Sequence, residues 1–322
     1  MIVLLFTGGT ISMRFDARAG GSVPALAGSE IFAATPGLAE VAEMEIDDFG
    51  AFPGPHMTTE RMWELRGRIA AHLERPGVQG VVVTHGTDTL EESAYLCARS
   101  LPAVKPVVFT GAMRSASDLG WDGPANLLDA ARVAASPESR GIGTMVTMGG
   151  RIFAGVDDTK VHTHLLDAFE SPGLGPIGVI DDGEVVYVRA LSYGGPVLTP
   201  TQLASPVDIV GAWAGADARL LDASRAEGKG VVLSALGRGN VPPAMVPGIE
   251  RWIAEGKPVV ISSRAQRGRV GHTYGYPGGG RTLQQLGCVF AGSRRPPQAR
   301  IDLMLALGAG MAGEELRTFF ED

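Results

Sequence analysis

Short apolar runs bounded by turn residues recur along this chain, and they restrict its fold more than any other feature. Strands that are buried on both faces of a parallel sheet have this appearance, because neither face needs polar residues. The runs are residues 2–6, 80–84, 106–110, 143–147, 209–213, 230–234 and 258–262. They predict parallel strands distributed over the whole chain.

Helical patterns lie between these runs. Between residues 58 and 73 the apolar residues recur every three or four positions, which is the spacing of one helix face. Asp122 is a plausible N-cap for another helix, which opens with Pro124 in its first turn. Strands that alternate with helices predict an α/β fold with a mostly parallel sheet flanked by helices.

The length of 322 residues exceeds what one hydrophobic core usually organises, so we expect two domains. A stretch rich in glycine, proline and serine precedes the apolar run at residue 209. We therefore expect a larger N-terminal domain of residues 1–190, a linker of residues 191–207 and a smaller C-terminal α/β domain of residues 208–322.

The charge balance argues against nucleic acid as a partner. The chain has 4 Lys and 24 Arg against 35 acidic residues, for a net charge of −7. It has no basic run that could follow a phosphate backbone.

The apolar start at residues 2–6 is too short for a signal peptide, and no stretch approaches the ~20 apolar residues that span a bilayer. Cys97 and Cys288 form no CxxC pair, which favours reduced thiols and the cytoplasm. No metal or other cofactor is indicated.

A first candidate for chemistry follows the first apolar run, in the motif TGGTI at residues 7–11. The strand delivers the Thr10 hydroxyl into a glycine-rich turn whose backbone a ligand can approach closely. Thr10 is therefore a candidate nucleophile. The alternative is an ordinary strand-to-loop turn that Thr10 merely caps.

Two further motifs could supply partners for that hydroxyl. The run at residues 80–84 leads into HGTDT, which places Thr87 and Asp88 at the carboxyl end of a neighbouring strand; capping of the next helix would also explain them. Lys160 lies among polar residues in DDTKVHT, whereas the other lysines directly precede apolar runs. It could accept a proton beside these groups, or simply form a surface ion pair with Asp157 or Asp158.

Taken together, these motifs resemble those of the bacterial-type L-asparaginase and glutaminase-asparaginase family. The shared motifs are TGGTI, HGTDT, FTGAMR with a following DGPANL, DDTKVHT, GRGN at residues 237–240 and PPQARI at residues 296–301. The resemblance covers nearly the whole chain. It implies the two-domain asparaginase fold, a homo-oligomer (a dimer or a tetramer of close dimers), no metal, and amide hydrolysis by two threonines.

The resemblance also assigns roles to single residues. Thr10 matches the nucleophile that forms an acyl-enzyme, and Thr87, Asp88 and Lys160 match the second threonine, the aspartate and the lysine. Asp88 additionally matches the ligand of the substrate α-amino group. Asn240 matches an asparagine that a neighbouring subunit contributes to the site.

Glycines complete the expected substrate site. Gly9 and Gly86 leave room for a ligand beside the two threonines. Gly54 and Pro55 stand where the family has a serine, followed by a small or amide residue, that holds the substrate α-carboxylate. That departure puts the preference for free asparagine as the substrate in doubt. A different or larger amide would fit the altered site equally well.

Two more positions depart from the family pattern. The lid that follows TGGTI, residues 12–28, lacks the family's tyrosine, since the first tyrosine of the chain is Tyr95. No acidic residue matches the glutamate that normally accompanies Asn240. Tyr274 or Tyr276, in the corresponding loop, could reach across a subunit interface instead.

The sequence therefore predicts an amidohydrolase that converts L-asparagine to L-aspartate and ammonia through Thr10. One alternative is the same chemistry on glutamine or on a D-configured or modified amide. Another is an amino-acid-binding protein of the same fold that has lost turnover.

Overall fold

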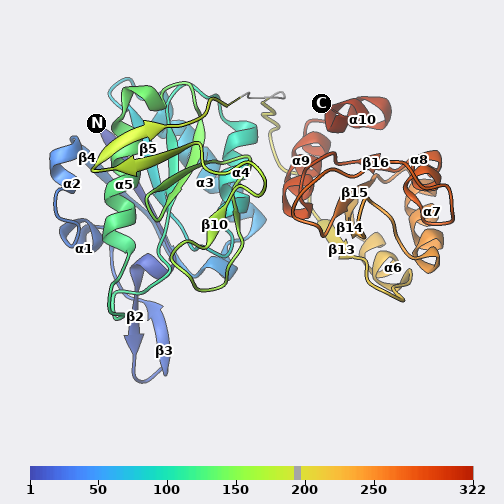
Figure 1. Ribbon diagram of the computed structural model, residues 1–322, viewed down its shortest axis with the longest axis horizontal. Helices are drawn as coiled ribbons and strands as arrows, with labels where there is room; N and C mark the ends of the chain where they lie inside the picture. Colours follow the sequence, from blue (N-terminus) through green and yellow to red (C-terminus); the bar gives the residue numbers. More distant parts are fainter. Residues whose placement is uncertain (192–196, 322) are drawn as a thin grey trace. The chain divides into compact units, whose positions relative to one another are not determined.

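The computed structural model describes residues 1–191 and 197–321 of the chain. The chain forms two compact units, Met1–Tyr193 and Gly194–Asp322 (Figure 1). Within the linker expected at residues 191–207, residues 192–196 lie outside the described residues. The first strand of the C-terminal unit begins at Val207.

The N-terminal unit contains a sheet of eight strands in the order β12-β11-β8-β7-β6-β5-β1-β4. Its strands are β1 (Ile2–Gly8), β4 (Met44–Phe52), β5 (Gly80–Thr84), β6 (Val107–Thr110), β7 (Thr144–Met148), β8 (Arg151–Ala154), β11 (Gly178–Asp181) and β12 (Glu184–Tyr187). The strands from β4 to β7 are parallel, and β8, β11 and β12 pair antiparallel at one edge. The predicted mostly parallel sheet is confirmed.

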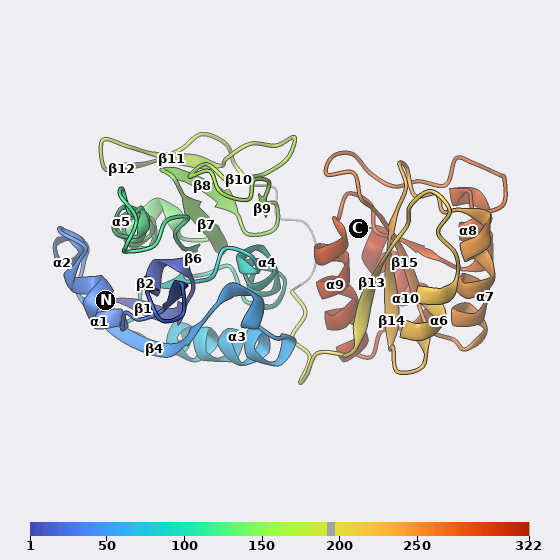
Figure 2. The same ribbon diagram turned by 90° about the horizontal axis from the view of Figure 1, so that it is seen from below.

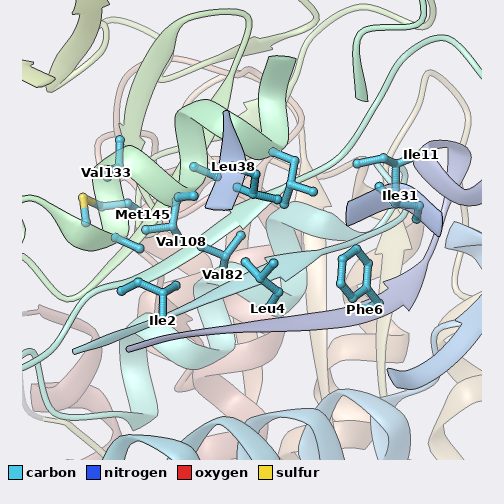
Figure 3. Packing of buried hydrophobic residues seen from close by; sticks show 14 of the residues in the cluster. Ile2, Leu4, Phe6, Ile11, Ile31, Leu38, Val82, Val108, Val133 and Met145 are labelled. Atoms are coloured by element: carbon cyan, nitrogen blue, oxygen red, sulfur yellow. The ribbon is translucent and has the colours of Figure 1, made fainter. Parts of the chain in front are cut away.

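Helices cover both faces of this sheet. The helices are α1 (Gly28–Ala33), α2 (Leu38–Val41), α3 (Thr59–Glu74), α4 (Leu90–Ser100) and α5 (Gly123–Ala135). Figure 2 shows α3 and α4 on one face and α1, α2 and α5 on the other. Alternate residues of β1 turn to opposite faces, so Ile2, Leu4 and Phe6 pack together toward α5 (Figure 3). Burial on both sides explains why this strand is apolar from Ile2 to Phe6.

The helix expected near residues 58–73 is confirmed as α3, and the Thr58 hydroxyl accepts a hydrogen bond from the backbone N–H of Arg61. The expectation for Asp122 is only half right. Asp122 precedes α5 as its N-cap residue, but its side chain makes no capping bond there. Its carboxylate instead accepts the N–H groups of Met113 and Arg114 and thereby orders the loop after β6.

Two short two-stranded ribbons extend from the N-terminal unit. The hairpin of β2 (Met13–Asp16) and β3 (Gly21–Pro24) projects away from the main sheet (Figure 1). Backbone N–H groups of Ala116 and Phe15 bond it to the loop after β6, at 3.0 Å to Met13 O and 2.9 Å to Ser117 Oγ. The second ribbon pairs β9 (Thr159–Lys160) with β10 (Phe169–Glu170).

The C-terminal unit is a smaller α/β domain, as predicted. Its parallel strands follow the order β13 (Val207–Gly211), β14 (Gly230–Ala235), β15 (Val259–Ser263) and β16 (Val289–Phe290). Its helices are α6 (Arg219–Arg225), α7 (Val246–Ala254), α8 (Gly280–Leu286), α9 (Pro296–Gly308) and α10 (Gly313–Glu321). Helix α9 packs on one face of the sheet, and α6 and α7 cover the other (Figure 2).

The strand expected at residues 209–213 lies two residues earlier, as β13. Because β13 is an edge strand, Asp208 and Ile209 are exposed, and a polar residue is tolerated within it. A continuous apolar run therefore does not mark the beginning of this strand. In the part of the chain that the structure describes, no helix combines the length and apolar character needed to cross a membrane.

Candidate active site

Neighbouring parallel strands bring the two threonine motifs to one edge of the sheet. β1 and β5 pair in parallel, with Phe6 opposite Thr84, so the turns that follow both strands leave the sheet at the same edge. The Thr7 hydroxyl donates a 2.8 Å hydrogen bond to the Thr84 carbonyl and ties the two strand ends together. The turn after β1 carries Thr10, which is half-buried, and the turn after β5 carries Thr87.

Three glycines let three backbone segments touch beside these threonines. A Cβ atom on Gly9 would lie 2.6 Å from both the N and the Cα of Gly86, and one on Gly86 would lie 2.4 Å from the Cα of Gly54. Gly9 also has a φ of +82°, which favours glycine. Gly9 and Gly86 are therefore required by packing, because main-chain atoms occupy the space that a side chain at either position would need. Pro55, next to this stack, is exposed in a short 3₁₀ turn.

Lys160 contacts both polar residues of the HGTDT motif. Its ammonium donates 2.8 Å hydrogen bonds to the Thr87 hydroxyl and to the Asp88 carboxylate. The lysine side chain is only 17% exposed, whereas that of Asp88 is 56% exposed, so the carboxylate remains accessible to a ligand. The alternative was a surface ion pair of Lys160 with Asp157 or Asp158, but the ion pair that the lysine forms is with Asp88. The Asp157 carboxylate lies 3.5 Å from the Arg189 guanidinium.

Helix capping does not account for Thr87 and Asp88. Helix α4 begins at Leu90, and its N-cap residue is Thr89, whose side chain makes no capping bond. The Thr89 hydroxyl instead donates to the carbonyl of Gly54 at 2.8 Å, which holds the third glycine segment against the HGTDT turn. The arrangement therefore leaves the Thr87 hydroxyl and the Asp88 carboxylate facing Lys160.

His85 is a structural member of the site that the sequence analysis did not single out. Its ring is fully buried, with Nδ1 2.9 Å from the Gly86 carbonyl and Nε2 2.8 Å from the Ser93 hydroxyl. Because a carbonyl only accepts, Nδ1 carries the proton, and Nε2 accepts from Ser93. Burial lowers the pKa of His85 to about 4, so the ring is neutral near pH 7. The eight-residue spacing from His85 to a serine on one face of the following helix is the signal that could have found it.

The expected lid corresponds to the β2–β3 hairpin and the residues around it. Asp16, one of its polar residues, accepts the N–H groups of Arg18 and Ala19 and closes the hairpin turn. Tyr95, the first tyrosine of the chain, lies buried in α4 and is not part of the hairpin. Residues 12–28, and with them the hairpin, contain no tyrosine.

The residues expected to reach the site of a neighbouring subunit, Asn240 and Tyr274 or Tyr276, belong to the C-terminal domain. The Asn240 side-chain oxygen accepts the N–H of Gly280 at 3.2 Å. Tyr274 and Tyr276 are half-exposed, with ring centroids 5.6 Å apart. Among the described residues, no three His, Cys, Asp or Glu side chains gather closely enough to hold a metal ion.

Comparison with known proteins identifies the family. The model described as "Asparaginase, N-terminal" matches residues 1–193, and "Glutaminase/Asparaginase C-terminal domain" matches residues 206–320. The chain belongs to the asparaginase family. This family member is 40% identical to the probable L-asparaginase of Deinococcus radiodurans, over 99% of this chain and 96% of that protein.

Two further similarities support the assignment of this asparaginase-family chain. It is 35% identical to the L-asparaginase of Bacillus licheniformis, over 97% of each protein. Its structure matches that of the probable cytoplasmic L-asparaginase from Campylobacter jejuni with a TM-score of 0.89 and 28% identity, over 100% of this chain and 99% of that one. The predicted family and fold are both confirmed.

Proposed function

We propose that this protein hydrolyses the side-chain amide of L-asparagine to L-aspartate and ammonia. The observation that carries the proposal is the contact of Lys160 with Thr87 and Asp88, at the sheet edge where the Thr10 turn also emerges. L-Asparaginases among its relatives support asparagine as the substrate.

In the proposed reaction, Thr10 is the nucleophile. Its Oγ forms a bond to the carboxamide carbon, and the tetrahedral intermediate then expels the nitrogen, which takes up the hydroxyl proton and leaves as ammonia. The product is a threonyl ester. Water attacks that ester, the Thr10 oxygen regains a proton, and the acid is released.

Thr87 and Lys160 handle the protons in this scheme. The 2.8 Å hydrogen bond between them connects the hydroxyl to an amine that can receive and return a proton. Asp88 is exposed on its outer side, and we assign its carboxylate to the substrate α-ammonium group, which carries the opposite charge.

The test is ammonia release by the purified protein with L-asparagine, comparing the wild type with Thr10→Ala. We expect the variant to lose at least about a thousandfold in kcat, because acyl transfer by a covalent route requires the nucleophile. Thr318→Ala, on the exposed side of α10, is the matched control and should release ammonia at the wild-type rate. Normal turnover by Thr10→Ala would remove Thr10 from the mechanism.

The second candidate function is the same chemistry on another amide. Gly54 has no side chain and Pro55 has no backbone N–H, so this turn offers few donors for an α-carboxylate. The ammonia assay should therefore include L-glutamine, the D-isomers and amides whose α-carboxylate is blocked. A higher kcat/KM for a blocked amide than for L-asparagine would favour this candidate. Stabilisation by asparagine without any ammonia would instead indicate a binding protein.

Assembly and location complete the proposal. We propose a homo-oligomer in which Asn240 of a neighbouring copy reaches the site, and we test it by mixing Thr10→Ala with Asn240→Ala protein after reversible dissociation. Recovery of activity in the mixture would support a shared site, whereas no recovery would refute it. We also propose a cytoplasmic location, supported by two buried free cysteines and by the description of the Campylobacter jejuni relative; cell fractionation tests it.

A further inference from the structure

Glu91 makes two short hydrogen bonds that none of the roles above uses. A single carboxylate oxygen, Oε2, accepts the Thr159 hydroxyl and the backbone N–H of Lys160, both at 2.6 Å. Glu91 lies in the first turn of α4, two residues after the end of the HGTDT motif. One side chain therefore links the segment that carries Thr87 and Asp88 to the segment that carries Lys160.

The segment that carries Lys160 has little other regular structure to hold it. β9 consists of only two residues and pairs with the equally short β10, in a ribbon separate from the eight-stranded sheet (Figure 2). Two-stranded ribbons of this length contribute little stability by themselves. The Glu91 contacts are therefore well placed to fix the backbone from which the lysine side chain extends.

The lysine needs such a fixed position. Its ammonium must stay within hydrogen-bond distance of Thr87 and Asp88, which are more than seventy residues away in the sequence. One continuous turn and helix carries Thr87, Asp88 and Glu91. The hydrogen bonds of Glu91 therefore attach Lys160 to the same element that carries its two partners.

We infer that Glu91 is a positioning residue that holds Lys160 in register with Thr87 and Asp88. Its role depends on an acceptor oxygen at the right place and not on a negative charge, because both of its partners are neutral donors. The inference rests on the proposed function, since it concerns the rate of the reaction that Lys160 assists.

The first experiment compares Glu91→Ala with Glu91→Gln in the ammonia assay. Loss of both bonds in Glu91→Ala should lower kcat about 10- to 100-fold, as expected for small misplacements of a catalytic group. KM should change by less than about threefold, because Asp88 still binds the substrate. Gln keeps a carbonyl oxygen that accepts two hydrogen bonds, so it should retain at least about half of the wild-type kcat.

Control measurements separate position from general damage. Glu74→Ala removes an exposed glutamate at the end of α3 and should leave kcat unchanged. Thermal unfolding identifies any variant that has lost its fold. A folded Glu91→Gln protein that is as slow as Glu91→Ala would overturn the inference, because the charge would then be the essential property.

The second experiment is a double-mutant cycle with Lys160→Ala. If Glu91 acts through Lys160, adding Glu91→Ala to Lys160→Ala should change kcat by less than about twofold. A structural role unrelated to Lys160 predicts the full additional loss, which would also overturn the inference. If Lys160→Ala turns over no faster than Thr10→Ala, the comparison of Ala and Gln at position 91 decides.

If the proposed function is wrong, the ammonia assay gives a different result. In that case wild type and Thr10→Ala release ammonia equally, whatever residue occupies position 91. Thr10-dependent ammonia together with a Glu91→Ala protein of normal kcat would refute the positioning role alone.

Discussion

Acidification should destabilise the N-terminal domain through the buried ring of His85. The ring is fully buried, and burial lowers its pKa from 6.5 to about 4. Since the folded state prefers the neutral ring, the stabilisation is complete above pH 6.5 and is lost as the pH falls from 6.5 toward 4. At pH 5 the difference spans 1.5 pH units, and at 1.36 kcal/mol per unit it amounts to about 2 kcal/mol.

The perturbation is His85→Asn, which removes the titrating ring and keeps an N–H donor for the Gly86 carbonyl. The variant will be less stable at every pH, but its stability should change less between pH 7 and pH 5. Carboxyl groups do not obscure the comparison, because both proteins contain the same ones; Asp129, whose pKa is raised by burial, titrates alike in both. Asp47 and Glu45 have pKa values lowered by their arginine partners, so their contributions are lost only below about pH 4.5.

Hydrogen exchange followed by mass spectrometry can measure this change in stability within the N-terminal domain. Peptides that cover β1 and β5 report opening of the N-terminal sheet, after correction for the intrinsic pH dependence of exchange. Between pH 7 and pH 5 the wild-type protein should lose about 30-fold in protection beyond the loss shown by His85→Asn. An equal loss in both proteins would refute the reasoning and mean that the buried ring is not held neutral.

Two further predictions concern packing and thiol chemistry. Gly86→Ala should lower the midpoint of thermal unfolding and abolish most ammonia release, because its new Cβ would lie 2.4 Å from the Gly54 backbone. Gly67→Ala is the matched control: it meets no atom within 4 Å in the helix α3, and it should stabilise the protein by about 0.5–1 kcal/mol. Burial raises the pKa of the Cys97 and Cys288 thiols to about 12, so a disulfide reagent at pH 8 should label neither in the folded protein and both after denaturation. Rapid labelling of the native protein would contradict that prediction.

Local patterns predicted the central strands because these are buried on both faces. Every residue of β5 is buried, so the sequence shows a continuous apolar run with clear ends. The edge strand β13 has one face in solvent, and its start was misplaced by two residues. The same reasoning explains why the cap expected at Asp122 failed: the carboxylate found N–H partners in a loop that the helix pattern does not include.

The residues of the candidate site that lie within single sequence motifs could be predicted. TGGTI, HGTDT and DDTKVHT pointed to Thr10, Thr87, Asp88 and Lys160, and the structure brings the last three into contact. The supporting contacts were not predictable, since they join residues whose partners depend on tertiary structure. The bonds of Thr89 to the Gly54 carbonyl and of Glu91 to the backbone of Lys160 belong to this class.

The two bonds between the β2–β3 hairpin and the loop after β6 bear on how a substrate enters. Any outward movement of the hairpin breaks the contacts of Ala116 with Met13 and of Phe15 with Ser117. At a net ~0.5–1.5 kcal/mol each, the two bonds alone disfavour such a movement by ~1–3 kcal/mol, which would hold an open form to roughly one molecule in six to one in 150 if nothing else restrained the hairpin. A substrate that enters only through the open form binds with its apparent affinity reduced by that fraction.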